Sequence, residues 1–259
     1  MMIAITRGLK FKAIIALIVI GLVVNGYFYF YNQAYLKYIL FWAIGFMVLA
    51  SLLSYQNGKR LGTNSLGKIW ILFSVGFLIW TFVNLVSTAY TLIYQRVFPY
   101  FWTLVAVDLI GYVVFAYALV YLAKFVNLIR ISKKPKLPWT KLAFLLTVGS
   151  LSILGLALTY TYTVYKNNYL FIIYLFADTL IAGSMLLPLL SLKDLSIQRP
   201  FALFIFGFIL LVAAESTYFL FIISGVYEHL FVGSPQHFLY MLAFGVFALG
   251  AYDQKRQLS

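Results

Sequence analysis

Apolar runs of about 20 residues recur along the whole chain, separated by short polar segments. At a rise of about 1.5 Å per residue, each run is long enough to cross a hydrocarbon core about 30 Å thick. The ten-residue alternation typical of an outer-membrane barrel does not occur. The pattern therefore predicts helical spans at residues 11–31, 35–55, 69–94, 100–124, 140–165, 169–192, 201–224 and 236–252.

The fold class expected from this pattern is all-α: a polytopic transmembrane helix bundle of eight helices in a single integral membrane domain, residues 1–259. The polar segments between the spans carry turn signals, as in "QNGKRLGTNSLGK" (56–68), "SKKPKLPW" (132–139) and "GSP" (233–235). The composition agrees, because only 10% of the residues are charged, whereas a soluble domain carries about 25%.

Lysine and arginine are distributed unequally between the two sides of the predicted bundle. Of the 19 basic residues, all but Lys37, Arg96 and Lys166 fall on the side that holds both termini. The positive-inside rule then predicts a multi-pass protein of the cell membrane with both termini in the cytoplasm. An odd number of spans would break this sorting, so eight is favoured over seven.

The net charge of +13 follows from the same distribution. Basic loops next to membrane spans rest on anionic headgroups, so the lipid bilayer is the expected partner of this charge. The loops are too short to build a folded basic surface, and no nucleic-acid partner is expected. Cysteine is absent, which excludes disulfides and thiolate metal sites.

The chain shows a weak internal similarity at an offset of 131 residues. "FSVGF" (73–77) then aligns with "FIFGF" (204–208), and Asn84 aligns with Glu215. Two halves, 11–131 and 140–252, would each hold four spans and share one membrane orientation, with a binding site at their interface. The alternative is a chance match between aromatic-rich helices, because 20% of the residues are Phe, Trp or Tyr.

Four polar residues lie at one depth inside four different spans: Asn84, Asp108, Asp178 and Glu215. The remaining acids, Asp194, Glu228 and Asp253, are placed in loops or in the tail. A charged residue at the centre of a span costs about 2.5–3.5 kcal/mol on insertion scales. Helix rise puts all four roughly 12–15 Å below the outer surface, so we expect them to converge and, without a nearby cation, to hold or share protons.

Two uses of this polar set remain open from the sequence. The carboxyl groups could join helices through hydrogen bonds to neighbouring hydroxyls, each worth about 1 kcal/mol or less. Alternatively, the set could bind a proton, a cation or a polar ligand, which is the usual role of ionisable groups inside a membrane.

The sequence offers no recognisable catalytic or cofactor site. Both histidines, His229 and His237, belong to the connection before the last span, which argues against haem ligation within the bundle. With Glu228 they could bind a metal, although ordinary loop histidines explain them better. No lysine lies at mid-depth to bind retinal, and no hydrolase or phosphate-loop motif occurs. Neither enzymatic activity nor a cofactor is expected.

Two segments carry a resemblance to a known group: "VDLIGYVVFAYALVYLAKF" (107–125) and residues 207–252. They resemble the multi-helix membrane regions at the N-terminus of bacterial and archaeal histidine kinases and diguanylate cyclases. Gly225 and Tyr227 fit the outer turn of these regions, whereas His237 stands where they have Asp. The resemblance implies a sensory role. No kinase or cyclase domain accompanies it in this sequence, so a signal would pass to a separate protein.

The function expected from these observations is that of a multi-helix membrane sensor or receptor. It would detect a small molecule, lipid, ion or pH change through the intramembrane polar site and signal to a separate partner. A proton- or cation-coupled secondary transporter is the first alternative, suggested by the repeat and the midplane acids. A structural or accessory subunit of a membrane complex is the second, and a homodimer is left open.

Overall fold

The computed structural model describes residues 2–31, 35–94, 101–133, 173, 176–181, 183–185, 198–223 and 236–258. These residues are helical apart from short turns, and no strand occurs among them. Six long helices are α1 (Met2–Tyr31), α2 (Tyr35–Leu61), α3 (Ser65–Tyr94), α4 (Phe101–Lys133), α7 (Gln198–Ile223) and α9 (Gln236–Gln257). The expected all-α class is confirmed.

Three of these helices are long and apolar enough to cross a membrane. They are Ser65–Tyr90, Thr103–Val126 and Gln198–Thr217, which match the predicted spans 69–94, 100–124 and 201–224. A shorter apolar helix covers Phe11–Val24. The predicted span 140–165 lies outside the described residues, as does much of the proposed second repeat half, so the repeat stays a prediction.

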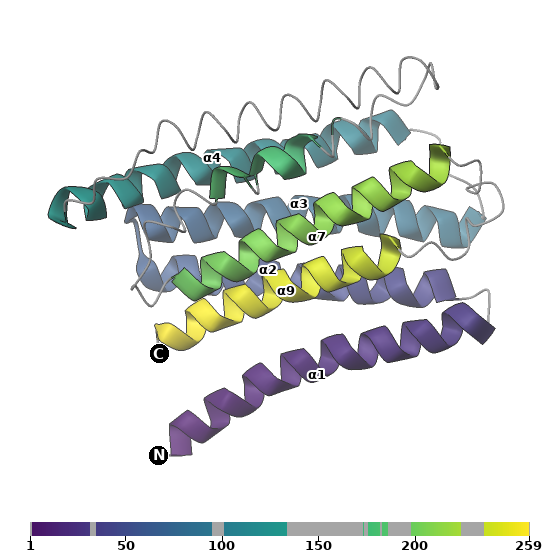
Figure 1. The fold of residues 1–259 in the computed structure, drawn as a ribbon, viewed down its shortest axis with the longest axis horizontal. Coiled ribbons are helices and arrows are strands. Elements are labelled where there is room, and N and C mark those ends of the chain that lie inside the picture. Colours follow the sequence, from purple (N-terminus) through teal and green to yellow (C-terminus); the bar gives the residue numbers. More distant parts are fainter. Residues whose placement is uncertain are drawn as a thin grey trace.

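The helices run side by side along the length of the bundle (Figure 1). α3 packs between α2 and α4, while α9 packs against α2 and α7. α1 packs less extensively, against α9 and α2, and it lies at one side of the bundle (Figure 1). The N and C marks stand at the same end of the bundle (Figure 1).

One end of the bundle carries most of the basic side chains that the structure places. We call it the basic end, defined by Lys59, Arg60, Lys68, Lys124, Arg199, Lys255 and Arg256. Two contacts join α2, α7 and α9 at this end. Asn57 Nδ2 on α2 donates to the Ala251 carbonyl oxygen on α9 over 2.7 Å, and Arg199 on α7 pairs with Asp253 on α9 at 3.5 Å.

The connection between α2 and α3 is much shorter than the loop predicted over 56–68. α2 continues to Leu61 and α3 begins at Ser65, because both helix ends are capped. Gly62 adopts a φ of +71°, and its N–H donates to the Gly58 carbonyl at 3.0 Å, as in a glycine C-cap. Asn64 Oδ1 accepts from the Gly67 N–H at 2.7 Å, as an N-cap residue does.

Gly62 allows a direct test of this cap. Gly62→Ala is expected to destabilise the fold by about 1 kcal/mol, because the left-handed conformation strains any residue with a Cβ. Gly45→Ala is the matched control, since a Cβ at either glycine meets no atom within 4 Å. Gly45 lies inside helix α2, so the same change there should be neutral or slightly stabilising. Thermal unfolding in detergent measures both, and equal shifts would contradict the cap.

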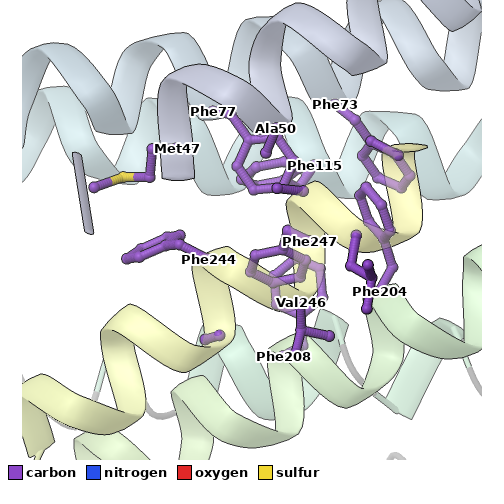
Figure 2. Packing of buried hydrophobic residues seen from close by; sticks show 14 of the residues in the cluster. Met47, Ala50, Phe73, Phe77, Phe115, Phe204, Phe208, Phe244, Val246 and Phe247 are labelled. Atoms are coloured by element: carbon purple, nitrogen blue, oxygen red, sulfur yellow. The ribbon is translucent and has the colours of Figure 1, made fainter. Parts of the chain in front are cut away.

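The interior of the bundle is built largely from phenylalanine rings contributed by α3, α4, α7 and α9 (Figure 2). Phe247 of α9 lies among them, with its ring centroid 5.0 Å from Phe77 and 4.9 Å from Phe208. Gly207 on α7 leaves room for this ring, because a Cβ at that position would lie 2.5 Å from a Phe247 ring carbon. Aromatic packing therefore fixes how α9 sits against α7 and α3.

Candidate functional site

Three of the four polar residues predicted to converge lie near one another. We call Asp108 on α4, Asp178 in the helical residues 176–181, and Glu215 on α7 the acid cluster. Asp178 lies within electrostatic range of both Glu215 and Asp108, and Glu215 within range of Asp108. Asp178 is 0% exposed and Glu215 is 7% exposed, whereas Asp108 is half-buried.

Glu215 is joined to α9 by a side-chain hydrogen bond. The Tyr240 hydroxyl of α9 donates to Glu215 Oε1. Within the described residues, Glu215 Oε2 and both carboxyl oxygens of Asp178 are buried without a hydrogen-bond partner of normal geometry. A buried polar atom without a partner is costly, so the acid cluster retains unused capacity to bind a proton or another donor.

Tyr112 of α4 places a hydroxyl beside Asp178. It is buried, faces the Asp178 carboxyl and lies within electrostatic range of all three acids. Its ring packs against Trp80 of α3 at 4.9 Å, and Trp80 Nε1 donates to the Asp108 carbonyl oxygen at 3.3 Å. The indole and the phenol thus fix the position of α4 next to the acid cluster.

Asn84 makes a different contact from the one the sequence suggested. Its Nδ2 donates to the Trp80 carbonyl oxygen of its own helix at 2.9 Å. This i, i−4 bond uses one amide N–H of Asn84 within α3 itself. Asn84 is thus linked to α4 only indirectly, because Trp80, whose carbonyl it bonds, donates to the Asp108 carbonyl. Its predicted role in binding stays a prediction.

The described basic side chains are remote from the acid cluster. On α7, Arg199 precedes Glu215 by 16 residues, which corresponds to about 24 Å of helix. No described group of three His, Asp or Glu side chains is close enough to hold a metal ion. Of the weaker metal candidates, Glu228 and His229 lie outside the described residues and His237 lies on α9.

Asp253 does not lie in an exposed tail, and that expectation is corrected. α9 continues to Gln257, so Asp253 faces the bundle and is 0% exposed. It pairs with Arg256 at 3.1 Å and with Arg199 at 3.5 Å, and both guanidinium groups also lie over the Phe11 ring of α1. The side chain serves as an ion-paired contact between α1, α7 and α9.

Tyr240 is a neighbour of the acid cluster that reasoning from depth did not select. Its Cα lies only four residues into α9, about 6 Å along the helix, while Glu215 lies deeper. The long phenol side chain covers the remaining distance. A depth estimate from Cα positions does not include the length of the side chain. A tyrosine near the start of an apolar helix could still be considered as a partner for a buried acid.

Comparison with known proteins finds no matching family model, no similar curated protein and no similar solved structure.

Proposed function

We propose that this chain is a membrane-embedded sensor whose acid cluster takes up and releases a proton. The observation that carries the proposal is the burial of Glu215 and Asp178 within electrostatic range of each other, with Glu215 Oε2 lacking a hydrogen-bond partner among the described residues. Two buried carboxylates repel each other strongly in a medium of low dielectric constant. Proton occupancy is the simplest way to relieve that repulsion.

A change in proton occupancy can be passed on through Tyr240. Its hydroxyl donates to Glu215 Oε1, and a charged carboxylate accepts a stronger hydrogen bond than a neutral carboxyl does. The charge state of Glu215 therefore alters the strength of the link between α7 and α9. α9 reaches the basic end, where a separate signalling protein could read its position.

The proposal includes a specific placement in the membrane. The chain would be a multi-pass protein of the cell membrane with the basic end and both termini in the cytoplasm. Three apolar helices of sufficient length and the collection of placed basic side chains at one end support this orientation. The weak resemblance to sensor regions supports the signalling role.

Hydrogen–deuterium exchange of the reconstituted protein at several pH values tests the proposal. After correction for the intrinsic pH dependence of exchange, we expect protection of α7 around Glu215 and of α9 around Tyr240 to change with pH. Unchanged protection at every pH would refute proton sensing. Proton flux driven by a gradient in sealed proteoliposomes would instead identify a proton-coupled carrier.

A further inference from the structure

The interior of the bundle becomes more polar at the basic end. Toward the middle of the bundle it is filled by phenylalanine rings (Figure 2), whereas four buried side chains at the basic end carry polar atoms. We call this set the polar core end: Ser54 and Asn57 of α2, Trp70 of α3 and Gln254 of α9. None of the four is more than 1% exposed.

Contacts between α2 and α9 place three of these side chains on successive turns along one seam. Asn57 Nδ2 donates to the Ala251 carbonyl oxygen, and Gln254 follows Ala251 by three residues, on the neighbouring turn. Ser54 precedes Asn57 by three residues, so the two share one face of α2. The three polar side chains therefore follow the seam where α2 meets α9.

Trp70 of α3 lies next to the part of α2 that carries these polar side chains. Ser51 Oγ of α2 donates to the Ser74 carbonyl oxygen of α3 at 2.9 Å, which sets Trp70 about opposite the turn that carries Ser54. The Trp70 ring packs against Phe204 at 5.3 Å. Phe204 in turn lies against Gly250 of α9, where a Cβ would come within 2.9 Å of its ring.

Several polar atoms at this end lack a partner among the described residues. In these four side chains, five buried atoms have no hydrogen-bond partner within the described part of the chain: Ser54 Oγ, Asn57 Oδ1, Trp70 Nε1, Gln254 Oε1 and Gln254 Nε2. Buried polar side-chain atoms are paired in the large majority of cases, either with protein or with ordered water. Five such exceptions on α2, α3 and α9 at the basic end point to a hydrogen-bonding guest there.

We propose that the polar core end binds water inside the bundle. The indole and amide N–H groups are donors, the Asn57 and Gln254 oxygens are acceptors, and the Ser54 hydroxyl can be either. A cation would leave the N–H groups unpaired, and an anion would leave the amide oxygens unpaired. Water donates and accepts, and buried waters typically make about three hydrogen bonds each.

The ionic groups nearby do not change this assignment. Asp253 is next to Gln254 in the sequence, but its charge is already balanced by Arg199 and Arg256. The site therefore suits a neutral guest. It is independent of the acid cluster, because Glu215 lies about 24 Å along α7 from Arg199 at the basic end.

Hydroxyl-radical footprinting of the whole protein by X-ray pulses tests the inference, because the radicals form from water wherever it is bound. We expect oxidation of Trp70 to be several-fold greater than that of Trp80. Trp80 is the internal control, since it is also buried but its Nε1 already donates to Asp108 O. Equal background oxidation of the two residues would overturn the inference.

Three variants link any labelling to the polar core end. Ser54→Ala and Gln254→Met each remove a group that would hold the water, so both should lower Trp70 oxidation. Ser51→Ala is the control on the same helix, because Ser51 Oγ already has a protein partner, and it should leave Trp70 oxidation unchanged. Trp70 oxidation that neither Ser54→Ala nor Gln254→Met reduces would also overturn the inference.

Discussion

Glu215→Gln and Asp178→Asn are each expected to abolish the pH-dependent change in hydrogen exchange of α7 and α9. The amides have nearly the same shape as the carboxyl groups, so the bundle should keep its packing. They cannot gain or lose a proton near neutral pH, and the repulsion between Asp178 and Glu215 disappears in either variant. Exchange profiles over a pH series measure the loss.

Asp253→Asn provides a matched carboxyl-to-amide control for these two variants. Asp253 is as fully buried as Asp178, but it lies at the basic end and is paired with Arg199 and Arg256. This variant should retain the pH response of α7 and α9. If Glu215→Gln and Asp178→Asn retain it as well, the acid cluster acts only as packing between helices and the proposed function fails.

Phe247→Ala is expected to cause the largest loss of stability in the described bundle. In a bilayer the side chain stays in an apolar medium when helices separate, so the cost comes chiefly from lost packing. A void of roughly 100 Å³ at about 24 cal/mol per Å³ gives about 2 kcal/mol. Unfolding in mixed micelles at increasing denaturing-detergent fraction measures the difference.

Phe206→Ala is the control for the aromatic core. Phe206 is 49% exposed on α7 and points out of the bundle, where lipid can fill the space of the lost ring. We expect a small effect on unfolding. Comparable losses for Phe206→Ala and Phe247→Ala would mean that Phe247 does not hold α9 in the core as the structure places it.

Apolar run length predicted the described helices because it reflects a property of each segment by itself. The predicted span 69–94 is an example: its hydrophobicity alone indicates a membrane-length helix, and α3 covers it. Helix ends were predicted less well, since they depend on caps. The caps at Gly62 and Asn64 allow both helices to extend into residues 56–68. The polar composition of that segment had indicated a loop instead.

The sites were predicted less completely, because their side-chain contacts join helices that are far apart in the sequence. Equal depth placed Asp108, Asp178 and Glu215 in one layer, but depth carries no information on which way a side chain turns. Asn84 bonds to its own helix, and Asp253 pairs with Arg199 from another helix. Neither outcome follows from local polarity, because each is decided by which helices are neighbours.

The position of α9 has a consequence for how the protein is made. α9 follows in the chain the described helices that it packs against, namely α1, α2, α3 and α7. Until it leaves the ribosome, Phe77, Phe204 and Phe208 lack the Phe247 ring that packs among them, and Phe11 lacks Arg256. The earlier helices therefore lack these contacts until α9 itself has been synthesised.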